Sequence, residues 1–345
     1  MRSLVKTRAA AEMDLITDRP EPSIGPNDVL IKIRKTGICG TDRHIWEWDD
    51  WAASRIPVGT VIGHEFVGDV VEIGSEVQGI NIGDRVSGEG HIGCGNCSLC
   101  RTGNMHICAK VQIIGIDRDG CFADYLSLPA VNVWPVHPDI PDKIAAVFDP
   151  LGNAVHTVMC GDVSGKTVLI TGVGIIGLMS VTVAKAAGAA RIFVTDVDER
   201  RLKIARDLGA TDAFNAKADE WIDEIRAVTR GEGVDVLLEM SGIAKGIHQG
   251  FAALRPGGRA ALLGLPGRPI EFDLANEVIF KAATVIGVNG RRMFETWYQM
   301  QELLLSGRLE LDPIITHELP MEEFAKGFAL MQSGEGIKIV LDYAR

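Results

Sequence analysis

The sequence predicts an α/β protein in which a mostly β N-terminal part is followed by a doubly wound parallel sheet. Up to about residue 155, short apolar runs bounded by Gly, Pro and Asn are typical of the strands of a small barrel or sandwich. From about residue 165, strands alternate with glycine turns and helices, and this alternation predicts βαβ units in a parallel sheet. The length of 345 residues, at about 150 residues a domain, also fits two domains better than one.

These patterns place the expected elements along the chain. In the N-terminal part, the clearest strands are the apolar runs at 29–33 and 66–71. The alternating part begins with a strand at 168–171 and a helix at 178–187. The same rhythm then predicts strands at 192–195, 234–239, 260–264 and 284–288, and a helix at 199–208.

The chain changes character again after about residue 293. Apolar residues recur at i, i+3 and i+7 from Trp297, which predicts a helix that ends near Gly307. They recur at i, i+4 and i+7 from Phe324, which predicts a second helix. The apolar run at 337–341 predicts a last strand.

The composition argues against several classes of protein. Lys and Arg number 35 against 46 Asp and Glu, and the net charge of −11 argues against nucleic acid or an anionic membrane as the main partner. The longest nearly apolar stretch, 168–184, is shorter than the roughly 20 residues that a membrane span needs, and no signal-peptide pattern is present. Seven cysteines, an odd number, cannot form a complete disulfide framework. We therefore expect a soluble, cytoplasmic protein.

A nucleotide-binding motif lies at the start of the alternating part. Residues 172–177, GVGIIG, fit G-x-G-x-x-G between a predicted strand and a predicted helix. Glycine at Gly172, Gly174 and Gly177 permits a tight turn, brings the backbone against a pyrophosphate and aims the helix N-terminus at its charge. Asp196 ends the next strand, where a carboxylate binds the adenosine ribose and repels a 2′-phosphate. A Rossmann sheet that binds NAD rather than NADP is predicted, and a plain glycine-rich turn is the alternative.

Four cysteines, Cys94, Cys97, Cys100 and Cys108, follow one another in the pattern C-x2-C-x2-C-x7-C. Four thiolates this close can surround one tetrahedral Zn²⁺, and because they leave no open position such a zinc is structural. An iron–sulfur cluster uses similar spacings and remains an alternative, as do disulfides. We expect a structural zinc in a lobe that spans 90–115.

A second set of possible metal ligands comprises Cys39, His64 and Glu65. A thiolate, an imidazole and a carboxylate all bind zinc, and three protein ligands leave one position for a substrate. Because Cys39 and His64 are 25 residues apart, spacing alone also fits a buried cysteine and a buried histidine with structural roles. The two remaining cysteines, Cys121 and Cys160, are expected to be packed thiols.

Taken together, the motifs occur in the order found in the zinc-dependent medium-chain alcohol and polyol dehydrogenases, which the sequence resembles over nearly its whole length. The segments that carry this resemblance are GICGTD (37–42), GHE (63–65), GDRV (83–86), the four-cysteine pattern and GVGIIG (172–177). A narrower resemblance, to the members that oxidise L-threonine, lies in IKIRKT (31–36), HIWEWDDW (44–51), GEGH (88–91), DPLGNAVH (149–156) and MFETW (293–297).

The resemblance implies a domain organisation. A GroES-like partly open β-barrel, the catalytic domain, would occupy 1–155, and a Rossmann domain that binds NAD would occupy 156–293. The segment 294–345 would return to the catalytic domain. Members of the family commonly assemble as homotetramers, and we expect the same here.

The resemblance also assigns roles to residues of the catalytic domain. By their motif positions, Thr41 and His44 match the proton-relay pair of the family, whereas composition alone would favour a turn residue and a surface histidine. Their chemistry suits a relay, since a hydroxyl donates and accepts at once and histidine exchanges protons near neutral pH. His91 lies in a segment that faces the substrate in relatives. Cys39, His64 and Glu65 would be the ligands of the catalytic zinc, and Asp149 would be a further carboxylate close to it.

The implied cofactors are NAD and two zinc ions per chain. The residues that match NAD contacts of the family, besides the motif glycines, are Ile176, Asp196, Arg201, Leu263, Gly264, Leu265, Val288 and Asn289. The implied substrate is L-threonine, a small molecule whose secondary alcohol would be oxidised to L-2-amino-3-oxobutanoate. The alternatives are a related zinc polyol or diol dehydrogenase, of the sorbitol or 2,3-butanediol type, and a non-catalytic NAD-binding regulator. An open zinc site argues against the regulator, which has no use for one.

Three of the six tryptophans, Trp46, Trp48 and Trp51, fall within eight residues. Packing is the favoured interpretation of this cluster. A cap over the substrate cleft and a contact between subunits are the alternatives.

Overall fold

The chain divides between two structural units of different architecture. In the computed structural model, which describes residues 1–344, the first unit comprises Met1–Asp149 and the segment from Ile315 onward, and the second comprises Pro150–Ile314. In this division the C-terminal return begins at Ile315 and not at residue 294, because helix α10 (Glu295–Leu305) belongs to the second unit. The predicted α/β fold class is confirmed.

The first unit is built around a seven-stranded sheet in the order β16-β17-β3-β4-β5-β9. Strand β3 (Asp28–Ile38) pairs with β17, β4 and β8, so the sheet branches there. In β3, buried Ile31 and Ile33 alternate with exposed Lys32, which is the two-residue period of a strand with one face on a core. The other strands are β4 (Phe66–Ile73), β5 (Arg85–Gly88), β8 (Tyr125–Pro129), β9 (Val133–Pro135), β16 (Ile315–Pro320) and β17 (Lys338–Asp342).

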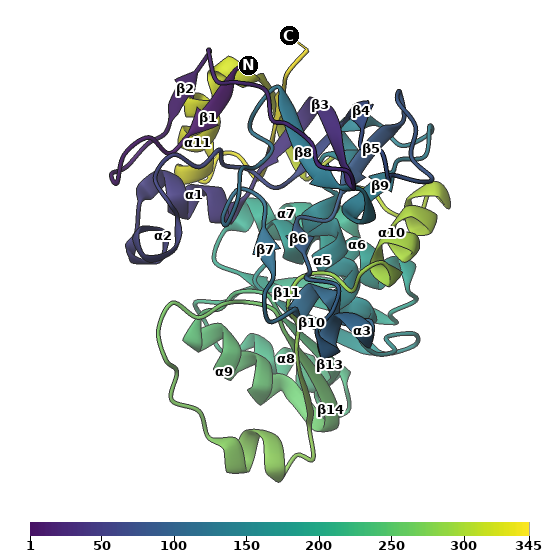
Figure 1. The fold of residues 1–345 in the computed structure, drawn as a ribbon. Coiled ribbons are helices and arrows are strands. Elements are labelled where there is room, and N and C mark those ends of the chain that lie inside the picture. The colour runs from purple at the N-terminus through teal and green to yellow at the C-terminus, as the bar shows by residue number, and fades with distance from the viewer. Residues whose placement is uncertain (345) are drawn as a thin grey trace. The chain divides into compact units, whose positions relative to one another are not determined.

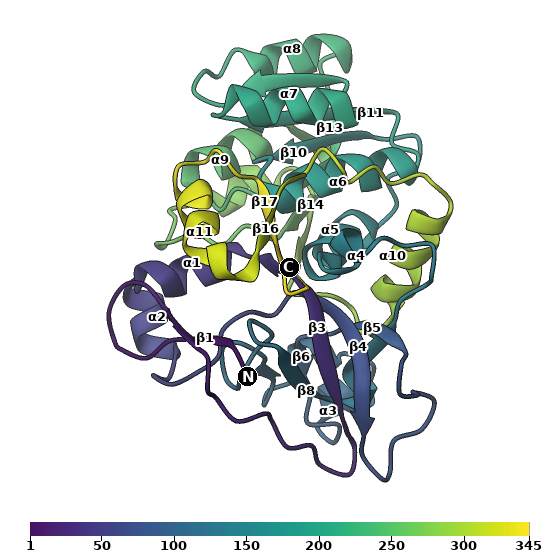
Figure 2. The same ribbon diagram turned by 90° about the horizontal axis from the view of Figure 1, so that it is seen from above.

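Shorter elements complete the first unit. Helix α11, from the C-terminal end, lies beside α1, from the N-terminal part, in both views of the fold (Figure 1, Figure 2). The helices and turns are α1 (Gly40–Glu47), α2 (Asp50–Arg55), α3 (Ser98–Arg101), α4 (Asp142–Ala145), α11 (Phe324–Gln332), η1 (Met105–Ile107), η2 (Ala130–Asn132) and η4 (Met321–Glu323). Two small strand pairs are β1 (Ser3–Val5) with β2 (Asp14–Ile16), and β6 (His91–Ile92) with β7 (Gln112–Ile113).

The tryptophan cluster is mostly a packing feature. Trp46 stacks on Phe328 of α11 with ring centroids 4.5 Å apart, and the ammonium of buried Lys6 lies 4.6 Å from the centre of the Trp48 ring. Trp51 differs, because 42% of it is exposed and its ring meets His44 edge-on. Two tryptophans therefore hold α1 in place, and the third borders a histidine.

The second unit is a six-stranded parallel sheet in the order β12-β11-β10-β13-β14-β15, as the alternating pattern predicts. The order reverses between β10 and β13, and in such sheets ligands bind at the carboxyl ends of the strands beside the reversal. The strands are β10 (Thr167–Thr171), β11 (Arg191–Asp196), β12 (Asp212–Asn215), β13 (Val234–Glu239), β14 (Leu254–Leu262) and β15 (Thr284–Gly287). The helices are α5 (Phe148–Met159), which leads in from the first unit, α6 (Ile175–Ala186), α7 (Glu199–Leu208), α8 (Trp221–Val228), α9 (Ala244–Ala253), the π-turn η3 (Ala275–Ile279) and α10.

Most expected elements agree with the structure, and β14 shows where they differ. It begins at Leu254, which pairs with Val234, although the regular pairing resumes only at Arg259. The intervening Pro-Gly-Gly looks like a turn in sequence but is a bulge inside the strand. The nearly apolar stretch 168–184 forms β10 and most of α6, and no helix within residues 1–344 has the length and apolarity to cross a membrane.

Candidate metal and nucleotide sites

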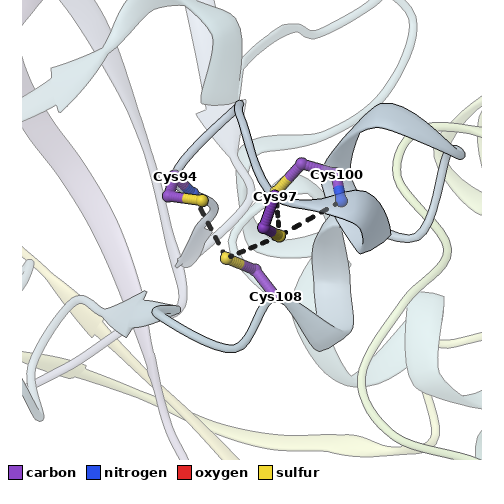
Figure 3. Close-up of side chains that lie close together, drawn as sticks. All are labelled: Cys94, Cys97, Cys100 and Cys108. Atoms are coloured by element: carbon purple, nitrogen blue, oxygen red, sulfur yellow. Dashed lines mark hydrogen bonds between the residues drawn. The ribbon is translucent and has the colours of Figure 1, made fainter.

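The four cysteines of the 90–115 lobe converge on one point of the first unit (Figure 3). All four sulfurs lie within 4.8 Å of one another, with 3.5 Å between Cys97 and Cys100 and 3.8 Å between Cys97 and Cys108. A tetrahedron of sulfurs about 2.3 Å from a zinc ion has edges of roughly 3.8 Å. All seven cysteines of the chain are unpaired, so disulfides do not explain the convergence. The arrangement fits a tetrahedral metal ion.

Local structure holds these thiols in that arrangement. Cys97 caps helix α3, where its sulfur accepts a hydrogen bond from the backbone N–H of Cys100, and this bond helps lower the pKa of Cys97 to about 6. The Cys108 sulfur accepts from the N–H groups of Cys94 and Lys110, at 3.3 Å each. Such bonds favour thiolates, the form that binds metal. Gly95 adopts a φ of +72°, a turn conformation that other residues rarely take.

A second convergence joins Cys39, His64 and Glu65, whose ligand atoms also lie within 4.8 Å of one another. Cys39 is the residue just before helix α1, and His64 and Glu65 directly precede β4. Gly63, directly before His64, cannot be replaced easily for two reasons. Its φ is +92°, and a Cβ there would lie 2.4 Å from the ring of buried Phe122. The structure thus brings together the three predicted ligands, although 25 residues separate the first two in sequence.

The electrostatic surroundings of this second site favour a cation. Asp42 is fully buried, accepts a hydrogen bond of 2.8 Å from the Cys39 N–H, and lies 3.6 Å from Nδ1 of His64. Burial raises the pKa of Asp42 to about 6. Burial opposes a charge on His64, yet Asp42 and Cys39 raise the pKa of His64 to about 10. Because Nδ1 of His64 and Oε1 of Glu65 have no hydrogen-bond partner within residues 1–344, this negative pocket fits a bound metal ion.

Lys338 is a residue of this site that sequence reasoning missed. Its ammonium contacts Oε2 of Glu65 and donates a 2.9 Å hydrogen bond to the carbonyl of Ile38, and both charged side chains are fully buried. The signal in the sequence is a lysine at the start of the apolar run that forms β17. Its meaning depends on the pairing of β17 with β3, which only the fold reveals.

The other predicted residues of the first unit lie at different distances from the three ligands. The Thr41 hydroxyl is 3.8 Å from the Cys39 sulfur, and His44 follows one turn later on α1 with an exposed side chain. Asp149 is buried and close enough to help raise the pKa of His64, but its carboxylate is not among the converging ligand atoms. His91 lies in β6, where its N–H and Nδ1 are each 2.9 Å from one oxygen of buried Glu89.

A cavity of about 310 Å³ lies at the reversal point of the parallel sheet in the second unit. Gly172, Gly174, Asp196 and Arg201, all predicted nucleotide contacts, line it. Gly172 has a φ of +83°, and a Cβ on Gly177 would lie 2.1 Å from the Gly172 carbonyl oxygen. The motif glycines are therefore needed for the turn and for the close approach of α6 to it.

Asp196 is fixed at the edge of this cavity. Its carboxylate accepts hydrogen bonds from the backbone N–H groups of Val173, Val197 and Asp198, at 2.8 to 3.0 Å. Of the remaining predicted contacts, Ile176 lies in the first turn of α6. Leu263, Gly264 and an exposed Leu265 follow β14, and Val288 and Asn289 follow β15.

Glu239, at the end of β13, is a second residue that the sequence analysis missed. Its carboxylate is fully buried and accepts from the N–H and hydroxyl of Ser241 and from the N–H of Gly242, while its backbone oxygen accepts from Leu263 and Gly264. These bonds fix the loop after β13, whose residues Met240 and Ser241 line the cavity. The sequence signal is a carboxylate that ends an apolar strand, as at Asp196.

Comparison with known proteins identifies a family for each of the two units. Residues 25–139 match the family model of the alcohol dehydrogenase GroES-like domain, and residues 176–306 match that of zinc-binding dehydrogenases. The chain is 48% identical to an L-threonine 3-dehydrogenase of Proteus mirabilis (strain HI4320) over 99% of this chain and 100% of that one.

Solved structures agree with this placement. An alcohol dehydrogenase from Thermus sp. ATN1 is 31% identical with a TM-score of 0.89 and 99% coverage of both chains. A zinc-binding dehydrogenase from Sinorhizobium meliloti 1021, solved with NADP, is 28% identical with a TM-score of 0.88 over 99% of this chain and 98% of that one. The chain therefore belongs to the zinc-dependent alcohol dehydrogenase family, which includes the L-threonine 3-dehydrogenases.

Proposed function

We propose that the protein is an NAD-dependent zinc enzyme that oxidises the secondary alcohol of L-threonine to L-2-amino-3-oxobutanoate. The observation that carries the proposal is the convergence of Cys39, His64 and Glu65, in which Oε1 of buried Glu65 has no hydrogen-bond partner within residues 1–344. Three ligands of mixed type leave an open coordination position, as catalytic zinc sites do. The 48% identity to an L-threonine 3-dehydrogenase over the whole chain supports this substrate.

In this proposal each ligand set holds one zinc. Cys94, Cys97, Cys100 and Cys108 would hold a structural ion. Cys39, His64 and Glu65 would hold a catalytic zinc, whose contribution would be Lewis-acid polarisation of the alcohol oxygen. Asp149 adds negative charge beside the catalytic site, and Asp42 orients His64 from behind. His91, held by Glu89, faces the substrate.

The proton of the alcohol leaves along helix α1. Thr41 accepts it through its hydroxyl, which can donate its own proton onward at the same time. His44 stands one turn later with an exposed ring, so it can pass that proton to water. The charge released by the oxidation therefore does not remain in a buried site.

NAD is the proposed hydride acceptor, bound in the cavity of the second unit. Gly172 and Gly174, which line the cavity, would face its pyrophosphate with Ile176 and Gly177, and Asp196 and Arg201 would hold its adenosine ribose. The carboxylate of Asp196 would repel a 2′-phosphate, which favours NAD over NADP. The contacts nearer the nicotinamide are Leu263, Gly264, Leu265, Val288 and Asn289.

A homotetramer in the cytoplasm is the proposed working form. Strand β15 is an edge of the parallel sheet, and Val285 on it, with Ile279 and Phe280 just before it, is exposed. An unpaired apolar edge favours pairing with a second copy of the chain. Seven unpaired cysteines, five of them proposed metal ligands, fit a reducing compartment.

One assay tests the function. The zinc-loaded protein is given NAD with L-threonine, sorbitol or 2,3-butanediol, and NADH is followed by absorbance. We expect the highest kcat/KM with L-threonine. Preference for either polyol would overturn the substrate assignment, and the absence of NADH with all three would overturn the enzymatic proposal.

A further inference from the structure

The ring of His44 contacts a carboxylate that has no role in the proposed proton path. Nδ1 of His44 lies 2.6 Å from Oδ2 of Asp49. We propose that Asp49 is a positioning residue, which fixes the orientation and tautomer of His44 so that Nε2 is the nitrogen that carries the proton out. This inference rests on the proposed function, because it requires His44 to be the last group of the proton path.

The position of Asp49 is set independently of His44. Asp49 is the N-cap of helix α2, and its other oxygen, Oδ1, accepts a 2.9 Å hydrogen bond from the N–H of Ala52. Trp48, with a φ of +56°, makes the turn that brings the start of α2 back beside the last turn of α1. One oxygen of Asp49 therefore caps helix α2 and the other contacts the imidazole. The capping bond fixes the position of the carboxylate.

The ring of His44 is confined on a second side. The indole of Trp51, on α2, meets it edge-on with ring centroids 6.2 Å apart. Within residues 1–344, the contact with Asp49 is the one hydrogen bond of the ring. With Nδ1–H donated to the carboxylate, the neutral ring presents a lone pair at Nε2, and its side chain is 58% exposed, so water reaches it.

The spacing on α1 places Thr41 beside His44 on the helix surface. Thr41 and His44 are three residues apart, so they are neighbours on one face of the helix. A proton that moves from the Thr41 hydroxyl to Nε2 produces an imidazolium whose Nδ1–H already faces an anion. Loss of the Nε2 proton to water restores the neutral ring, with no change at Nδ1.

Other charged groups around His44 are occupied elsewhere. On α1, Arg43 pairs with Glu47, which also accepts from Gln332 of α11. The remaining charged groups on α2 and α11 are Asp50, which is exposed, Arg55, which pairs with Asp117, and Lys326, which pairs with Glu323. Asp49 is thus the carboxylate in contact with the ring.

Asp49→Asn separates the positioning role from the capping role. Asparagine caps helices as well as aspartate does, so the helix keeps its Ala52 bond. The atom that then faces Nδ1 is an amide NH₂, a donor, which forces Nδ1 to accept and places the ring proton on Nε2. The resting tautomer is reversed while the fold is retained. Asp49→Ser, another good cap without a carboxylate, is a second variant, and Asp50→Asn is the matched control.

The test follows kcat and KM for L-threonine oxidation against pH. We expect both Asp49 variants to lose at least about tenfold in kcat near neutral pH with KM for NAD unchanged, and to recover at alkaline pH, where hydroxide accepts the proton directly. Asp50→Asn should behave like the unmodified protein. In a His44→Ala background, Asp49→Asn should cost little more, because the two residues act as a unit.

A second readout needs no activity. Nitrogen-15 NMR of histidine-labelled protein reports which ring nitrogen of His44 carries the proton, and Asp49→Asn should move it from Nδ1 to Nε2. If His44→Ala lowers kcat but the Asp49 variants do not, or if the tautomer is unchanged, the positioning role is overturned while the proposed function stands. If His44→Ala itself leaves kcat unchanged, the proton path of the proposed function fails.

Discussion

Lys338 places its ammonium group against the carboxylate of Glu65, and both side chains are fully buried. The pair joins the C-terminal strand β17 to the residue that precedes β4, and Glu65 is one of the three converging ligands of the second site. The ammonium group offsets the charge of a carboxylate that would otherwise lie unpaired close to buried Asp42. Lys338 therefore supplies the positive charge that buried Glu65 needs in the zinc-free protein.

Lys338→Met should destabilise the zinc-free protein strongly. Removal of one partner leaves a buried, unpaired charge, which typically costs about 3–5 kcal/mol. We expect denaturant unfolding in the presence of a chelator to show a loss of this size, and added zinc to reverse part of it. Lys35→Met, which removes a lysine that pairs with Glu318 and Asp342 and is 15% exposed, is the matched control and should cost less. Equal stability of the two variants would refute the role of Lys338.

The four-cysteine lobe predicts a metal stoichiometry. Cys100→Ser removes one of four thiolates, so the zinc content should fall from two ions per chain to one, with a lower midpoint of thermal unfolding. Cys160→Ser, outside both ligand sets, should retain two ions. Metal analysis after gel filtration measures the content, and two zincs at full stability in Cys100→Ser would contradict a structural zinc.

Asp196→Asn should relax the choice between the two nicotinamide cofactors. The amide keeps one oxygen for the backbone N–H groups but removes the charge that repels a 2′-phosphate, so the ratio of kcat/KM for NAD over NADP should drop at least about tenfold. Asp198→Asn, a neighbour whose carboxylate pairs with Arg200, is the control. An unchanged ratio in Asp196→Asn would count against its ribose role.

Glu239→Gln should weaken NAD binding without slowing the bound enzyme. The amide NH₂ would face the N–H donors of Ser241 and Gly242, so the loop along the cavity would shift. We expect the Kd for NAD to rise about tenfold or more, which corresponds to roughly 1.4 kcal/mol, while kcat at saturating NAD stays close to normal. Glu277→Gln, which removes the carboxylate on η3 that pairs with Lys281, provides the comparison. An unaltered Kd would show that the loop does not depend on this carboxylate.

Local patterns in the sequence predict most of the fold and name both metal-ligand sets as candidates. Periodicity located β13 and α7 at their observed bounds, because regular elements repeat their apolar residues at fixed intervals. Gly172, Gly174 and Asp196 line one cavity, since all three belong to one continuous βαβ segment, and nucleotide binding there stays a prediction. The four cysteines lie within 15 residues, so local chain geometry alone can bring them together.

Contacts between residues far apart in the sequence become visible in the folded chain alone. Lys338 meets Glu65 because β17 pairs with β3, and no local pattern encodes a pairing of strands about 300 residues apart. Glu239 binds the loop after β13 because the parallel strands β10, β13 and β14 end side by side. Asp49 contacts His44 because a left-handed residue turns α2 back beside α1. The sequence specifies which charged groups the chain has. Long-range pairing of strands and helices determines which groups are in contact, and burial strengthens these contacts because water screens them less.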